Sequence, residues 1–144
     1  MKEIVKAIQD RIKSEVSEIK YIDMDYGQLN EENPPVKCPA VVIDIDGMEC
    51  EQMQECGDAK LQRVTASIRI TLAWLHTSPS NQASPSRNTA LKYWDVLGKI
   101  HQALQGFTDG EHFGALFRTR MASRMAANGM IEKDVYYSTI FLEE

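Results

Sequence analysis

The chain has 144 residues, 43% of them hydrophobic and 26% charged, with a formal net charge of −5. This length and composition predict one globular domain over residues 1–144. The acidic balance argues against a dedicated nucleic-acid binder, and the sequence shows neither a membrane-spanning apolar run nor the apolar core of a secretion signal. Three cysteines without a CxxC spacing indicate free thiols in a reducing compartment.

The first third of the chain predicts one helix followed by two strands. Apolar residues recur every three or four positions, as in an amphipathic helix that lies on a sheet, at Ile4, Ile8, Ile12, Val16 and Ile19. Residues 21–26 alternate in polarity and predict a short strand, whereas residues 27–37 contain consecutive prolines and predict a loop. Residues 39–47 predict a second strand.

The alternation over residues 62–75 is the strongest structural signal in the sequence. Every second residue is apolar, which predicts a strand with one buried face formed by Val64, Ala66, Ile68, Ile70, Leu72 and Trp74. We expect Ile68, Ile70 and Trp74 to face the helices. A strand of this length runs roughly 45 Å, so it is expected to project as half of a hairpin or to pair with a neighbouring subunit. The preceding residues 48–58 are polar and acidic and predict a connecting segment.

A second helix is predicted after a loop at residues 76–86, which is rich in Ser, Pro and Asn. Ser84 and Pro85 suit the start of this helix, which should end near Gln105 with Gly106 as its stop. Its expected buried stripe consists of Ala90, Trp94, Leu97, Ile100, His101 and Leu104.

Two strands close the chain, at residues 116–125 and 135–142. Residues 126–133 join them, with Asn128 and Gly129 as a turn signal. The expected order is α-β-β-β-α-β-β. This order indicates an α+β fold, with an antiparallel or mixed sheet of four to five strands and two main helices on one face.

The sequence contains none of the familiar catalytic or cofactor motifs: no nucleophile elbow, phosphate-binding loop, dinucleotide fingerprint or zinc-protease helix. Cys50 and Cys56, together with the histidines, lack the spacing of a structural zinc site. We expect a half-buried structural role for His101, whereas His76 and His112 fall in predicted loops. The acids between residues 44 and 58 are interpreted as a solvated edge and loop rather than a metal site. No catalytic residue, cofactor or metal is therefore expected.

The arginines of residues 116–125 share one strand parity, opposite Phe117, Met121 and Met125, which are expected to pack on the core. Scattered, solvated arginines are one interpretation. The functional interpretation is an electrostatic contact, either with an acidic segment of another subunit or with passing DNA. Methionines in the acidic segment would add adaptable apolar contacts. The candidate interface residues are Arg63, Arg69, Arg118, Arg120, Arg124, Asp44, Asp46, Met48, Glu49, Glu51, Met53, Glu55 and Asp58.

The order of elements and several local strings resemble the small tail terminator and minor tail proteins of long-tailed bacteriophages and prophages. The similar strings are KEIVKAIQDRI in the opening helix, PAVVIDI after the proline loop, and the alternating VTASIRITLAW. The similarity continues through LKYWDVLGKIHQAL to the closing strands LFRTRM and DVYYSTIFLE. It spans nearly the whole chain as a pattern rather than a fixed motif.

The resemblance implies a non-enzymatic protein that forms a ring, typically a hexamer, which caps the tail tube and joins it to the head connector. Its partners would be other copies of itself and the tube and connector proteins, without membrane contact. Its place would be the virion tail, after assembly in the bacterial cytoplasm. Terminators and other head–tail joining proteins stay open as alternatives. The rival hypothesis is a small cytoplasmic ligand-binding or enzymatic α+β domain with a pocket between sheet and helices.

Overall fold

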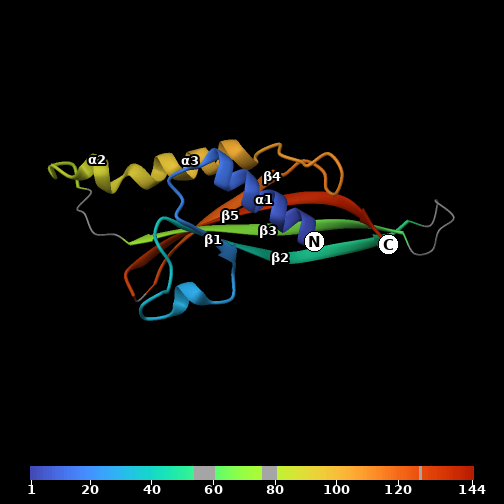
Figure 1. Ribbon diagram of the computed structural model, residues 1–144, viewed down its shortest axis with the longest axis horizontal. Coiled ribbons are helices and arrows are strands. Elements are labelled where there is room, and N and C mark those ends of the chain that lie inside the picture. Colours follow the sequence, from blue (N-terminus) through green and yellow to red (C-terminus); the bar gives the residue numbers. More distant parts are fainter. Residues whose placement is uncertain (54–60, 76–80, 127) are drawn as a thin grey trace.

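The computed structural model describes residues 1–53, 61–75, 81–126 and 128–144. Helices and strands follow one another in the order that Figure 1 labels. The elements are α1 (Lys2–Glu15), β1 (Tyr21–Met24), the 3-10 helix η1 (Gln28–Asn30), β2 (Ala40–Gln52), β3 (Gln62–Leu75), α2 (Arg87–Ala90), α3 (Lys92–Leu104), β4 (Phe117–Met125) and β5 (Met130–Glu143).

All five strands form one sheet in the order β1-β2-β3-β5-β4. β1 runs parallel to β2, and every other neighbouring pair is antiparallel. The predicted α+β fold with a mixed sheet is therefore confirmed. The register shifts at two places, between Ile45 and Gly47 in β2 and between Arg118 and Arg120 in β4. Such a bulge turns the following side chains to the other face of the sheet.

The helices α1 and α3 both lie over one face of the sheet (Figure 1). Ile8 and Ile12 of α1 are fully buried there, because their spacing keeps them on one side of the helix. Ile70 and the other apolar residues of β3 pack into the same core. The predicted inward faces of α1 and of residues 62–75 are therefore confirmed. We call this side of the sheet the helical face, and the other side the open face.

The open face is covered only in part, by the segment that contains η1 (Figure 1). Leu29 of η1 is buried against Val42, Ala73 and Met130, which form a second and smaller apolar cluster. Asn128 fastens the β4–β5 turn to this segment by donating to the carbonyl oxygens of Leu29 at 3.0 Å and Glu31 at 2.8 Å.

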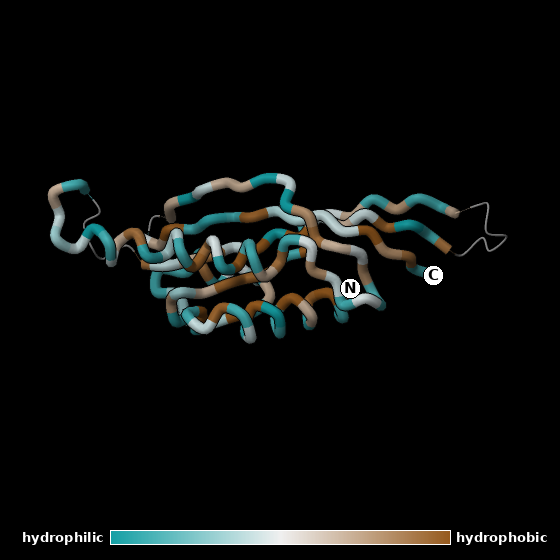
Figure 2. The backbone as a smooth tube through the Cα atoms, turned by 90° about the horizontal axis from the view of Figure 1, so that it is seen from above, coloured by the Kyte–Doolittle hydropathy of each residue, from teal (hydrophilic) through white to brown (hydrophobic). Residues whose placement is uncertain are grey.

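β2 is longer than the sequence predicts, because Met48–Gln52 continues the ladder with β3 instead of forming a connecting segment. The ends of β2, β3 and β5 extend past the beginning of α1 (Figure 2), which confirms the projecting hairpin. The side chains at this end of β2 are exposed. This end of β2 is held by its backbone hydrogen bonds to β3 and not by a buried apolar face.

The second helix begins later than predicted and is divided. The Ser84 hydroxyl accepts the backbone N–H of Ser86 within the preceding turn, and Leu91 separates α2 from α3. α3 ends at Leu104, and Gly106 adopts a positive φ of 76°, as the predicted stop requires. The prediction for Trp94 is wrong: it is 43% exposed. The buried side of α3 instead carries Val96, Leu97, Ile100, Ala103 and Leu104.

The closing hairpin has a tighter turn than predicted, because β5 begins at Met130 rather than at Val135. Gly129 takes a φ of 82° in this turn, which confirms the Asn-Gly signal.

Candidate subunit interface

The three arginines of β4 do not form one line, because the bulge at Thr119 separates them. Arg118 lies opposite Tyr137, on the helical face, whereas Arg120 lies opposite Tyr136, on the open face. The guanidinium of Arg120 stacks over the Tyr136 ring at 4.3 Å. The expectation that all three arginines share one face is therefore wrong.

The apolar side chains that alternate with the arginines along β4 do not pack on the core either. Phe117 and Met125 are 58% and 75% exposed, and Met121 is 45% exposed. β4 is the outermost strand of the sheet, and all but one of its side chains are exposed. Alternation in the sequence shows which side chains share a face of the strand. It does not show whether the strand lies at the edge of the sheet, where that face stays exposed.

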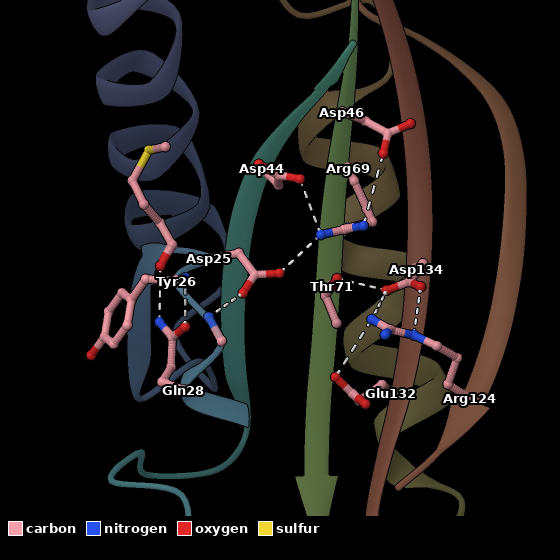
Figure 3. Close-up of polar contacts among 12 residues, drawn as sticks. Asp25, Tyr26, Gln28, Asp44, Asp46, Arg69, Thr71, Arg124, Glu132 and Asp134 are labelled. Carbon is pink, nitrogen blue, oxygen red and sulfur yellow. Dashed lines mark hydrogen bonds and ion pairs between the residues drawn. The ribbon is translucent and has the colours of Figure 1, made fainter. Parts of the chain in front are cut away.

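Arg69 is held inside the subunit by three carboxylates on the open face (Figure 3). Its guanidinium lies 2.9 Å from Asp25, 3.1 Å from Asp44 and 3.8 Å from Asp46. Burial opposes the charge of Arg69, but the negative charges of Asp44, Asp134 and Asp25 outweigh it and raise the pKa of Arg69. Sequence analysis grouped Asp44 and Asp46 with a contact surface, and it did not include Asp25.

Asp25 is placed beside Arg69 by the turn that follows β1 (Figure 3). The backbone N–H of Gly27 donates to the Asp25 carboxylate at 3.0 Å. The buried Gln28 side chain accepts from the Tyr26 N–H and donates to the Met24 carbonyl oxygen. These contacts give the turn one conformation, and therefore give the Asp25 carboxylate one position.

Arg124 is paired in the same way, with two acids of β5. It binds the Asp134 carboxylate through two nitrogens, at 2.9 and 3.1 Å, and lies 3.6 Å from Glu132. Thr71 also donates to Asp134, at 2.6 Å. Both acids are only 3% exposed, and burial raises the pKa of Glu132. No local sequence signal marks these two acids as buried, because their partners come from β3 and β4.

The remaining acids lie on the outer part of β2. Glu49 and Glu51 are exposed on the open face, and Glu51 pairs with Arg63 of β3 at 3.2 Å. Met48 is 49% exposed, and Met53 is half-buried where its N–H donates to the Leu61 carbonyl oxygen. The other two predicted interface acids, Glu55 and Asp58, lie outside the described residues.

Two unpaired edges run along opposite sides of the sheet. β1 pairs only with Ala40–Ile43, so Asp44–Glu51 has no strand on its outer side in the part of the chain that the structure describes. β4 is the last strand at the other side of the sheet. We call these the β2 edge and the β4 edge. The two edges are similar in length, and their charges are opposite: acids on the β2 edge and arginines on the β4 edge.

Two of the three histidines, His101 and His112, lie in the described part of the chain, and each has one polar side-chain partner. His101 is half-buried, as expected, with its Nδ1 3.0 Å from the Tyr137 hydroxyl. His112 lies 2.6 Å from the exposed Asp109 carboxylate, which raises the pKa of this histidine. Among the described residues, no three His, Cys, Asp or Glu side chains are grouped so as to hold a metal ion. His76 and Cys56 lie outside those residues. None of the described helices has the length and apolar character needed to cross a membrane.

Comparison with known proteins gives a likeness in structure and none in sequence. No protein-family model matches the chain, and no curated protein matches it in sequence. Among solved structures, the chain is similar to a chain of the virion of a native gene transfer agent particle, with 11% sequence identity. That match covers 94% of this chain and 84% of the other, with a TM-score of 0.47. At these values the likeness assigns neither a family nor a function.

Proposed function

We propose that this chain is a non-enzymatic virion assembly protein, a single tail terminator-like domain that forms a ring. In this role it caps the tail tube and joins it to the head connector, after assembly in the bacterial cytoplasm. The sequence resemblance to tail terminators supports the class of protein. The observation that supports ring formation is the presence of two unpaired, oppositely charged edges on opposite sides of one sheet.

The directions of the strands make the two edges compatible. Three antiparallel pairings separate β2 from β4, so these strands run in opposite directions. When a second copy is placed beside the first by rotation about an axis along the strands, its β2 edge meets the β4 edge as an antiparallel pair. Such a contact is heterologous, and it closes into a ring when the rotation divides a full turn. Six copies is the number that the resemblance implies.

The charges on the edges select this pairing over the alternatives. Arg120 of one copy and Glu49 and Glu51 of the next are on the open face. On the helical face, Met121 would approach the exposed Met48 of the neighbour. Two β2 edges, or two β4 edges, would bring like charges together, which is unfavourable. Charged residues and bulges on an edge also limit indiscriminate strand pairing.

The structure narrows the residues proposed for this contact. Arg69, Asp44 and Asp46 pair with one another within the subunit, and Arg124 pairs with the buried Asp134. We therefore assign the contact to Glu49, Glu51 and Met48 on the β2 edge, and to Arg118, Arg120 and Met121 on the β4 edge. Arg63 has a mainly local role through its pair with Glu51.

Charge exchange tests this assignment. Arg118→Glu with Arg120→Glu should dissociate the ring, and Glu49→Lys with Glu51→Lys should do the same, because each variant gives the two edges the same sign of charge. All four changes in one chain should restore association, since the attraction is then reversed. Native mass is the measurement. Lys6→Glu with Lys13→Glu on the exposed side of α1 is the control for net charge.

Restoration by the combined variant is the decisive result. Exposed pairs contribute only about 0–1 kcal/mol each and are screened by salt, so the loss should be strongest at low salt and should weaken as the ionic strength rises. If both double variants keep the mass of the parent protein at every salt concentration, the edge contact is excluded.

The contact with passing DNA stays a separate proposal for the β4 arginines. It predicts binding of duplex DNA that weakens with salt and is lost in the Arg118→Glu, Arg120→Glu variant. The Lys6→Glu, Lys13→Glu control carries the same change in net charge, and it should keep that binding. Equal loss in both variants would assign the effect to net charge alone.

A further inference from the structure

A second feature lies away from both sheet edges, between the N-terminal part of α3 and the adjoining end of the sheet. It is an open cavity of about 620 Å³. Trp74 at the end of β3 and Tyr93 at the start of α3 form one wall, with their rings stacked 3.5 Å apart. Pro39 and Val96 add apolar surface to the lining. An apolar group of a ligand would therefore be sheltered from water here.

Two polar atoms at this cavity are buried without a partner. The indole N–H of Trp74 finds no acceptor among the described residues, although Trp74 is only 6% exposed. Glu18 uses its Oε1 to accept from Lys99 at 2.6 Å, whereas its Oε2 is buried without a donor from the described residues. A buried N–H and a buried oxygen that lack partners cost free energy, which a ligand can recover by supplying both. One donor and one acceptor close together are what a peptide backbone offers.

The charge around the cavity defines the ligand further. Lys20 and Lys92 line it and are both exposed, and the charge of Glu18 is already paired with Lys99. The cavity is thus a locally basic site on a chain whose net charge is −5. A segment with carboxylates beside an apolar side chain complements both its walls and its rim.

We infer that this cavity docks an extended acidic segment of a partner protein, which inserts one apolar side chain against Trp74 and places carboxylates beside Lys20 and Lys92. The inference rests on the proposed assembly role, because a subunit that joins other virion proteins needs a docking surface besides its ring contacts. The docked segment would also supply the hydrogen-bond partners that Trp74 Nε1 and Glu18 Oε2 lack.

Trp74 fluorescence provides the test. The chain has two tryptophans, and Trp94 does not line the cavity, so a Trp94→Phe background leaves Trp74 as the only indole reporter. The probes are two capped peptides with the same apolar centre, Glu-Glu-Leu-Phe-Glu-Glu and Lys-Lys-Leu-Phe-Lys-Lys. We expect a saturable change in emission with the acidic peptide at a dissociation constant below about 1 mM. Binding of the basic peptide should be at least tenfold weaker.

Lys20→Glu with Lys92→Glu should reverse this preference, and both positions are exposed, so the fold is preserved. The control variant, Lys6→Glu with Lys13→Glu, should keep the preference for the acidic peptide. The absence of a saturable response to the acidic peptide, or equal binding of the two peptides, would overturn the inference. So would saturable binding of the small aromatic anion indole-3-acetate together with no binding of the peptide. None of these readouts depends on ring formation, so failure here leaves the edge contact untouched.

Discussion

At the scale of single residues, the open face is organised by two arginines that bind more carboxylates than they can neutralise. Arg69 contacts Asp25, Asp44 and Asp46, and Arg124 contacts Asp134 and Glu132 (Figure 3). The Arg69 contacts join β3 to β2 and to the turn after β1, and the Arg124 contacts join β4 to β5. Buried carboxylates are stable only where a cation or a donor compensates them. We therefore expect these arginines to affect folding rather than assembly.

Arg124→Gln should lower the free energy of unfolding by about 2–3 kcal/mol, because it leaves the buried Asp134 carboxylate without its cation. Arg120→Gln is the matched control. It removes only the contact with the Tyr136 ring and should cost at most about 1 kcal/mol. Urea denaturation of both variants measures the difference. Equal losses would show that the Arg124 pair does not stabilise the fold.

Glu132 should make stability depend on pH. Burial raises its pKa, so the folded chain still holds this proton at a pH where the unfolded chain has lost it. By linkage, this group lowers stability as the pH rises from the ordinary carboxyl range through the raised pKa. Glu132→Gln should therefore be more stable than the parent protein at pH 8, and the gap should close toward pH 4. Denaturation midpoints across this range measure the gap, and a constant gap would contradict the assignment.

At the scale of elements, the sequence predicts the helices and strands that bury one continuous apolar face. α1 and β3 were predictable because each presents a continuous apolar side to the same core. The end of β2 was not, since Met48–Gln52 is exposed and holds its ladder only through β3. The bulge at Thr119 also lacks a sequence signal, and it reverses which face Arg118 occupies. The charged contacts of the open face depend on register between distant strands, which no local pattern encodes.

The inward side of α1 gives a direct test at this scale. Ile12→Ala should lower the free energy of unfolding by about 2–5 kcal/mol, because Ile12 is fully buried and the change leaves a cavity. The neighbouring Lys13 is exposed, so Lys13→Ala should cost less than about 0.5 kcal/mol. Thermal or chemical unfolding distinguishes the two variants. Similar losses would contradict the packing of α1 on the sheet.

At the scale of the whole molecule, the sheet carries an acidic edge and an arginine edge that run antiparallel to each other. One subunit cannot pair these edges with each other, because β3 and β5 lie between them. In the proposed assembly a neighbouring copy pairs them, and repetition of that contact by rotation would produce a closed ring. The sequence predicted acids and arginines as candidate contact residues. Only the strand order showed that the charges lie at opposite sides of one sheet.

Native mass spectrometry over a range of protein concentrations tests ring formation most directly. The proposed contact predicts one closed species at high concentration, six times the 16.3 kDa chain, with few intermediates between it and the monomer. Intermediates are scarce because each added copy leaves two edges unpaired until the ring closes. A dimer as the largest species would indicate an isologous contact, and a monomer at every concentration would leave both edges without a partner; either result would contradict the account.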